Sequence, residues 1–468
     1  MVQTRGNLRK GVDDNPADYL YLIKVNASFD DRDKMIGALK AVQALQDEKI
    51  NPARTFASVR QPDGTRRPLF VVEDYHLNLL IGFGLRFFLG PLGSPGRANE
   101  QGVPNFPPGG TFTARIPNRF GMNDRVVPMY LRTMNAAGDQ GWITQQLTGA
   151  NNGQTPAAED VNAAYQAFLA QGECDLLFQV ECEYEFLVLE LIDELRSTVI
   201  DPMGLQIVSI QRGVTRGDGK AHIGFFDGTS NLQQMMLQDP QTYRSKIYLP
   251  TPSAAYPGQP TEVRDDHRYD GGTYLVYRKY LENLELWYSD DFEVTDFYGK
   301  TYKGEEARLH AIGHNPHTGR AISRASNQQL EPQPDHTEIN LSYNEAHALK
   351  ARGGQTAPFM GPFPPVPIGH SNAFNTQDIR IRRRGVSYAD LNTATGKLDY
   401  GLHFICFQNN IQQTGFEFIN NIWLINLDFR RSTDGLMNPV GKIITPQEGA
   451  YFFVPPEAHS YPGDVFFE

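Results

Sequence analysis

The spacing of apolar residues predicts alternating strands and helices in the first half of the chain. Tyr19 to Val25 is rich in aromatic and branched residues, which is typical of a strand. Asp31 is a good helix N-cap, and apolar residues then recur at helical spacing, so we expect a helix from Asp31 to Gln46. Further elements follow in the order strand, strand, helix, strand, at residues 77–83, 175–183, 184–196 and 205–211.

This order, strand-helix-strand-strand-helix-strand, is typical of a ferredoxin-like domain. The second half repeats it, with strands and helices expected at 273–280, 281–289, 379–387, 401–408 and 412–424. We therefore predict an α+β fold of two ferredoxin-like domains, with antiparallel sheets and helices packed on them. The predicted domains are residues 1–213, with long loop insertions rich in glycine, proline and polar residues, and residues 214–468.

Composition narrows the class of protein. The 468 residues carry a net charge of −11, which disfavours nucleic acid as a partner. The absence of any run of eighteen apolar residues argues against a membrane span. Three cysteines are too few for a disulfide framework, and the first residues contain no apolar segment of the kind found in secretory signals, so we expect a cytoplasmic protein. A homo-oligomer remains open.

The residues from Ala221 to Leu232, AHIGFFDGTSNL, contain the most distinctive chemistry. Asp227 follows two aromatic residues and precedes a glycine. Glycines let the backbone approach a flat ligand, and an acid shielded from water by aromatic rings suits proton transfer. By themselves these residues favour an ordinary Asp-Gly turn, because such turns are common.

The segment GFFDGTSN resembles the GxxDG signature of the dye-decolorising peroxidases, which are heme enzymes. Other stretches resemble segments of that family and occur in the same order: DGGTYLVYRKYLENLELW, GHNPHTGRAI, IRIRRRGVSY, GLHFICFQ and GAYFFVPP, which begin at residues 270, 313, 379, 401 and 449. Together they cover most of the second half. The resemblance implies a heme b peroxidase that reduces hydrogen peroxide and oxidises aromatic reductants such as dyes and phenols.

The resemblance also implies roles for particular residues. Asp227 corresponds to the family's distal acid, a proton shuttle, and Arg383 to its distal arginine. Gly228 and Thr229 are expected against the heme edge. Arg278 is expected to face a heme propionate, although a surface arginine on the strand explains it equally well.

Arg383 lies in a run of arginines, so its role depends on the register of the strand. Alternation places Arg382 and Arg384 on the opposite face from Arg383, and a slip by one residue would reassign the role. For Arg382 and Arg384 we expect a solvated strand face.

The axial histidine is assigned to His347, because AHALKAR resembles the family pattern around this ligand. His347 lies 36 residues before Arg383, a long spacing that the proline-rich segment 353–369 explains if it is an extended surface loop. His370, only 13 residues before Arg383, is the competing candidate, and His336 is a weaker one.

A partner for the axial imidazole is expected at Asn438, near Asp434, where the family places an acid. An amide would make the histidine a weaker electron donor than a carboxylate would. The sequence therefore leaves open a heme-binding or heme-handling protein with little turnover, and also a heme-free scaffold. His310, His314 and His317 have a spacing seen in zinc sites, but Gly313 and Pro316 interrupt any helix, so we expect surface histidines.

Overall fold

The structure is a computed structural model of the whole chain. It describes Val12 and Met122, Leu147, and residues 17–50, 56–60, 66–71, 76–91, 119–120, 143–144, 154–225, 240–249, 269–296, 298–316, 346–351, 381–411, 415–424, 435–437 and 443–467. The proline-rich segment 353–369 lies outside the described residues.

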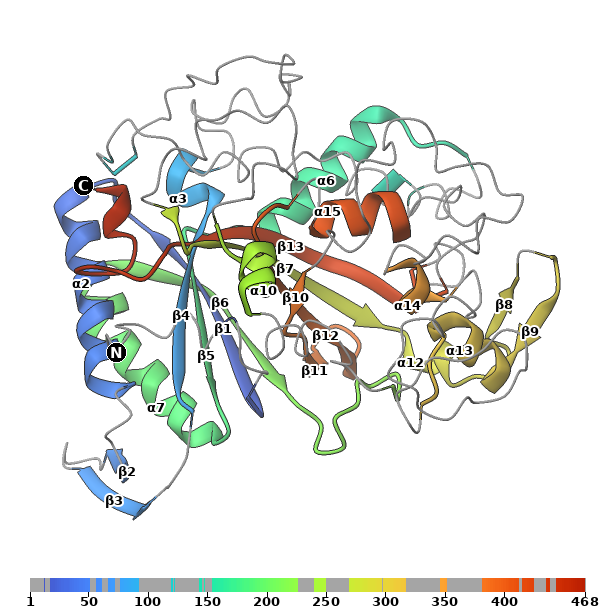
Figure 1. Cartoon of the computed structure of the whole chain (residues 1–468), viewed down its shortest axis with the longest axis horizontal. Coiled ribbons are helices and arrows are strands. Elements are labelled where there is room, and N and C mark those ends of the chain that lie inside the picture. The colour runs from blue at the N-terminus through green and yellow to red at the C-terminus, as the bar shows by residue number, and fades with distance from the viewer. Residues whose placement is uncertain are drawn as a thin grey trace.

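The first half of the chain forms one side of a nine-stranded sheet (Figure 1). Its strands lie in the order β4-β5-β1-β6, and every pairing among them is antiparallel. The strands are β1 (Tyr19–Ala27), β4 (Asn78–Gly84), β5 (Leu176–Cys182) and β6 (Leu205–Val214). The helices α2 (Arg32–Lys49) and α7 (Glu185–Leu195) lie between them in the chain, so this half has the predicted ferredoxin-like order.

Helix α2 shows how local sequence starts an element. Asp31 is its N-cap, and the Asp31 side chain accepts a hydrogen bond of 2.7 Å from the backbone N–H of Lys34. Met35, Leu39 and Val42 are buried on one face. The prediction of this helix is confirmed, although the helix runs to Lys49 rather than Gln46.

The second half repeats the arrangement. Its strands lie in the order β10-β12-β7-β13, and they are β7 (Thr273–Glu282), β10 (Arg382–Arg383), β12 (Lys397–Gln408) and β13 (Ile444–Val454). In chain order both halves read second, third, first, fourth strand across the sheet, so the fold is a duplicated ferredoxin-like one. The halves join where β13 pairs with β4. The exact boundary, between residues 213 and 214, stays a prediction.

Three predicted elements of the second half differ from the structure. The strand expected at 379–387 is divided into β10 and β11 (Val386–Asn392), which both pair with β12. The helix expected at 281–289 is only α12 (Leu284–Trp287), because β7 continues to Glu282 and the Asn283 side chain then caps the helix at Leu286 N–H, 3.0 Å away. The helix expected at 412–424 begins at α15 (Phe416–Phe418) and continues as the π-helix η8 (Ile419–Leu424).

The remaining elements connect or cover these strands. They are β2 (Phe56–Arg60), β3 (Arg66–Val71), α3 (Leu85–Leu89), α6 (Ala158–Gly172), η2 (Arg196–Ile200), α8 (Asp201–Met203), α10 (Pro240–Ile247), β8 (Glu293–Thr295), β9 (Thr301–Lys303), α13 (Gly304–Ile312), α14 (His347–Lys350) and η10 (Asp464–Phe466). No helix in the described part of the chain has both the length and the apolar character needed to cross a membrane.

The two halves of the sheet face each other across an apolar core. Leu20, Leu22 and Leu177 of the first half pack in the same cluster as Ile405 and Phe452 of the second half. Helices α2 and α7 cover the outer face of the first half, whereas α6 and α15 lie over the second half (Figure 1). We call the facing sides the inner face and the helix-covered sides the outer face.

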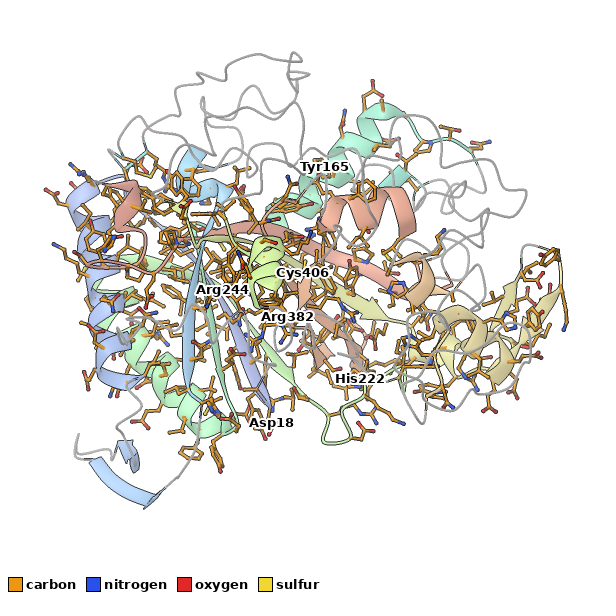
Figure 2. The ribbon with its side chains drawn as sticks, viewed as in Figure 1. Asp18, Tyr165, His222, Arg244, Arg382 and Cys406 are labelled. Atoms are coloured by element: carbon orange, nitrogen blue, oxygen red, sulfur yellow. The ribbon has the colours of Figure 1, made fainter. Side chains whose placement is uncertain are left out.

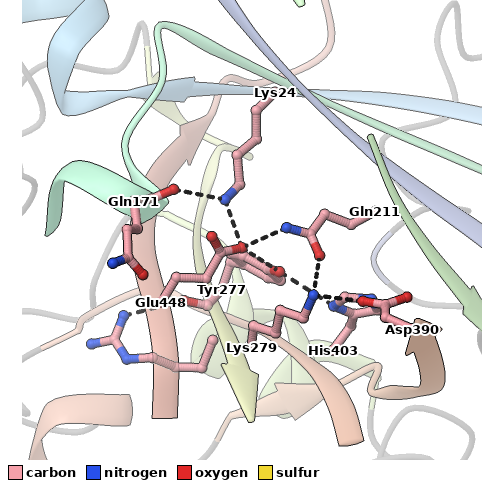
Figure 3. A network of polar contacts seen from close by, with 9 residues as sticks. Lys24, Gln171, Gln211, Tyr277, Lys279, Asp390, His403 and Glu448 are labelled. Carbon is pink, nitrogen blue, oxygen red and sulfur yellow. Dashed lines mark hydrogen bonds and ion pairs between the residues drawn. The ribbon is translucent and has the colours of Figure 1, made fainter. Parts of the chain in front are cut away.

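A buried polar network crosses the inner face between the halves (Figure 3). Lys24 of β1 is fully buried and forms an ion pair of 2.7 Å with Glu448 of β13. The same carboxylate accepts hydrogen bonds of 2.9 Å from the Tyr277 hydroxyl and from the Gln211 side chain. A β-bulge between Pro446 and Glu448 shifts the register of β13, and this shift turns Glu448 toward the inner face.

The network continues to an imidazole and to the surface. His403 Nδ1 lies 3.2 Å from the Tyr277 hydroxyl, and the His403 ring packs on that of Tyr388, with centroids 4.7 Å apart. Lys279 bridges Gln211 and the half-exposed Asp390. Burial, together with the nearby charges of Lys279 and Lys24, lowers the pKa of His403 to about 3, so His403 is neutral in the folded protein.

Replacing Glu448 by Gln tests the ion pair across the halves. The variant would leave the buried ammonium of Lys24 without a counter-charge, so we expect the free energy of unfolding to fall by about 3–5 kcal/mol. Urea unfolding measures this. The matched control is Asp201→Asn, which breaks the exposed 3.3 Å pair with Arg196 and should change stability by less than about 1 kcal/mol.

His403 should make the protein less stable in mild acid. The unfolded chain protonates this histidine near pH 6.5, whereas the folded protein does so only near the lowered pKa of about 3, so stability falls as the pH drops between these values. Between pH 7 and pH 5 the contribution is about 2 kcal/mol. We expect His403→Phe to reduce the difference between urea midpoints at pH 7 and pH 5; an unchanged difference would contradict a neutral His403.

Candidate active site

One row of paired residues across four strands shows which side chains project to the outer face of the second half. Arg383 of β10 lies opposite Cys406 of β12, Cys406 lies opposite Val276 of β7, and Val276 lies opposite Tyr451 of β13. Residues directly opposite each other in a sheet project to the same side. Arg383 therefore faces the side covered by α6 and α15. Figure 2 labels Cys406 near the middle of the molecule.

Arg278 lies in the next row of the same face, between Phe404 and Gly449. Its side chain is 1% exposed, and its Nη2 donates a hydrogen bond of 2.5 Å to the Tyr451 hydroxyl. The rings of Phe168, Phe416 and Tyr451 surround the guanidinium, with centroids 5.5, 5.0 and 4.6 Å away. Arg278 is thus not a surface arginine; its contact with a heme propionate stays a prediction.

The charges of both arginines influence the pKa of the Cys406 thiol. Burial raises the pKa of the Cys406 thiol, and the positive charges of Arg278 and Arg383 oppose that rise. The thiol stays protonated and serves as an apolar filler rather than a nucleophile.

The neighbouring arginines lie on the inner face, as the alternation predicts, but they are not solvated. Arg382 and Arg384 are 4% and 1% exposed, so the prediction of a solvated face is wrong. Arg384 donates two hydrogen bonds, of 2.8 and 2.9 Å, to the carboxylate of Glu181 in β5. Arg382 donates through Nε to the carbonyl of Val12 at 3.4 Å. The inner face is enclosed by the first half of the protein, which local sequence does not reveal.

Glu181 was not singled out from the sequence. It is 3% exposed, and it also accepts a hydrogen bond of 2.8 Å from the Asn78 side chain. The one signal for it was its position in the strand sequence LLFQVEC, where Leu177 and Gln179 share its side of the strand. A carboxylate in such a buried row requires a cationic partner.

The turn before Asp227 is well defined. Gly224 has a φ of 82°, a left-handed conformation that favours glycine, and Gly224 N–H donates to the Ala221 carbonyl at 2.9 Å. The indole N–H of the buried Trp287 donates to the Ile223 carbonyl at 2.9 Å. Asp227, Gly228 and Thr229 themselves lie outside the described residues, as do His336, His370, Asp434 and Asn438.

His347 begins the short helix α14, and its side chain is half-buried. The carbonyl of His347 accepts a hydrogen bond of 2.8 Å from Ala351 N–H. Ala346 and Lys350, on either side, are fully buried. Helix α14 packs against α13 and η8.

One apolar cluster brings the predicted site segments together. It contains Phe225, and Ala351, Ile381 and Phe404 pack against it. Phe225 is two residues before Asp227, Ala351 is four after His347, and Ile381 is two before Arg383. The described groups fit a heme: an imidazole suits iron, and the two guanidinium groups suit anionic oxygens of propionates or of peroxide.

The prediction of surface histidines is wrong for His310. It is 1% exposed and stacks on Tyr302, with ring centroids 3.5 Å apart, because α13 continues through it to Ile312. His314 is half-buried, and His317 lies outside the described residues. Among the described residues there is no group of three or more His, Cys, Asp or Glu side chains that could hold a metal ion.

Comparisons with known proteins agree with this architecture. Residues 368–459 match the sequence model of the family described as Dyp-type peroxidase, C-terminal. Three solved structures share the fold along nearly the whole chain. A DyP-type peroxidase from Cellulomonas bogoriensis has a TM-score of 0.58 at 16% identity, over 98% of this chain and 95% of its own. No curated protein matches the sequence.

The other two structures are also similar over most of their length. DtpA from Streptomyces lividans, in an oxyferrous complex, has a TM-score of 0.55 at 16% identity, over 100% of this chain and 97% of its own. A dye-decolorizing peroxidase from Bacteroides thetaiotaomicron has a TM-score of 0.50 at 17% identity, over 97% of both chains.

The fold and the outer-face site define a duplicated ferredoxin-like protein with the architecture of the DyP-type peroxidases. Residues 368–459 match the model of the Dyp-type peroxidase C-terminal family, which confirms the resemblance found in the motifs.

Substitution of Gly449 should disturb the packing around Arg278. An added methyl group would collide with Arg278 Nη1 and lie 2.7 Å from the Phe168 ring. We expect Gly449→Ala to lower the free energy of unfolding by about 1–3 kcal/mol, measured with urea. Gly217→Ala is the control, because a methyl group added there would have no heavy atom within 4 Å; equal stability of the two variants would contradict the tight packing.

Proposed function

We propose that this protein is a heme b peroxidase of the DyP type, which reduces hydrogen peroxide and oxidises aromatic reductants such as dyes and phenols. The observation that carries the proposal is the cluster shared by Phe225, Ala351 and Ile381, since their neighbours are Asp227, His347 and Arg383. Three chain segments that are far apart in sequence thus meet on one side of the second half. The matched family segment, residues 368–459, includes Arg383.

The bound heme would supply an iron centre that gives two electrons to peroxide and then recovers them from the reductants. His347 would bind the iron, and Arg278 would hold a propionate. Gly228 and Thr229 would lie at the edge of the ring. The cofactor is expected to sit against the outer face, because both described arginines project there.

Two groups of this chain would act on the peroxide. Asp227 would take a proton from one oxygen of hydrogen peroxide and deliver it to the other, so that this second oxygen can leave as water. Arg383 would stabilise the negative charge that develops on the departing oxygen. Its strand position places it on the outer face, the side opposite that of the Arg384–Glu181 pair.

Heme binding tests the axial assignment. We expect the purified chain to take up hemin with a Soret band, and His347→Ala to lose that band or shift it strongly because the iron loses its protein ligand. His370→Ala is the matched control and should bind hemin like the wild type. Loss of binding in His370→Ala alone would transfer the axial role to His370, and absence of a Soret band in the wild type would overturn the proposal.

Rapid mixing of the hemin-loaded protein with hydrogen peroxide tests the distal residues. We expect Arg383→Leu to slow the peroxide reaction by about 10²–10³-fold, and Asp227→Asn by about 10²–10⁴-fold, because each removes transition-state stabilisation or proton transfer. A wild-type protein that binds heme but reacts slowly with peroxide would instead be a heme-handling protein, the alternative that an amide at Asn438 leaves open.

A further inference from the structure

The strand that carries Arg383 is short and continues the register of the β11–β12 hairpin, since the pairs Arg383–Cys406 and Val386–His403 belong to one antiparallel alignment. Strand β10 spans only Arg382–Arg383 and pairs with β12 through two residue pairs. A shift by one residue would bring an arginine of the wrong face to the outer side. The hairpin sets this register, and a contact between Arg384 and the first half adds a second restraint at the end of β10.

The first half of the protein supplies that contact. Glu181 lies in β5, which pairs with β1 on one side and β4 on the other, so the position of its carboxylate is well fixed. Arg384 reaches across the inner face and forms the two hydrogen bonds of 2.8 and 2.9 Å with Glu181. A two-pronged contact of this kind fixes direction as well as distance.

Apolar neighbours select which arginine makes this contact. Ile381 packs against the outer-face clusters, whereas Val386 is buried in the inner-face cluster. With Ile381 outside and Val386 inside, strand alternation requires Arg384 inside and Arg383 outside. The backbone N–H of Arg384 also donates to the Ile405 carbonyl at 2.8 Å, which continues the pairing with β12.

We propose that Glu181 is a positioning residue for the active site: its bond to Arg384 anchors the end of β10 to the first half and thereby restrains Arg383 on the outer face. The first half of the protein then controls the chemistry of the second half through one buried ion pair. This inference rests on the proposed role of Arg383 toward peroxide.

The pair can be removed without leaving a charge behind. In the double variant Glu181→Leu with Arg384→Met both charges are replaced by apolar groups, a change that is often neutral for stability. The control is Lys49→Met with Glu194→Leu, which removes the buried pair between α2 and α7 on the outer face of the first half. Urea unfolding confirms that both double variants fold.

Hydrogen exchange on the purified full chain, with and without hemin, measures how firmly this segment is held. We expect the amides of residues 382–384 to exchange at least about tenfold faster in the Glu181/Arg384 variant than in the wild type or the control, because the bond to the first half no longer restrains the strand. Unchanged exchange in a folded variant would overturn the inference.

Peroxide kinetics then test whether the pair acts through Arg383. We expect the Glu181/Arg384 variant to react more slowly by roughly tenfold to a hundredfold, as misplaced catalytic groups do. Added to Arg383→Leu, the same changes should cause no further loss. A full additional loss would overturn the inference. If Arg383→Leu alone leaves the rate of the peroxide reaction unchanged, the proposed role of Arg383 is wrong. The exchange measurement then still decides whether Glu181 restrains the strand.

Discussion

Charge neutralisation between the two inner faces is the constraint on which the architecture depends. Lys24 with Glu448, and Arg384 with Glu181, each join a strand of the first half to a strand of the second half, away from water. Moving such charges out of water costs several kcal/mol per ion, so an unpaired arrangement is strongly disfavoured. The pairs therefore act mainly by excluding other relative positions of the halves, while the surrounding apolar cluster supplies the attraction.

Strand alternation gives the two faces of the second half different contacts. Alternation along β10 sends Arg382 and Arg384 inward and Arg383 outward, and alternation along β7 sends Tyr277 inward and Arg278 outward. On the inner face the charges of Lys24 and Arg384 are paired with carboxylates of the other half. The outer face of the second half is thus the side on which basic side chains can meet a ligand. Helix α6, although it precedes the second half in sequence, covers part of that face at Gly449.

Much of the fold was predictable because it rests on local periodicity. The strands of both halves and helix α2 follow from apolar spacing and, for α2, from the Asp31 cap. The predictions failed where a local pattern was overridden. The helix expected from Leu281 begins only after Asn283, and the strand around Arg383 is interrupted before Val386. Such boundaries depend on which neighbouring strand supplies hydrogen bonds, and that is a tertiary property.

By itself the sequence determined the duplicated ferredoxin-like order, the family resemblance and the opposite directions of Arg383 and its neighbours. These depend on repeat order, short motifs and the two-residue period of a strand, all of which are local. Only the tertiary structure decided that Arg384 and His310 are buried, that Glu181 is the partner of Arg384, and that Phe225, Ala351 and Ile381 share one cluster. Burial and pairing depend on contacts between separate elements, which for Glu181 and Arg384 are 203 positions apart, so no local pattern encodes them.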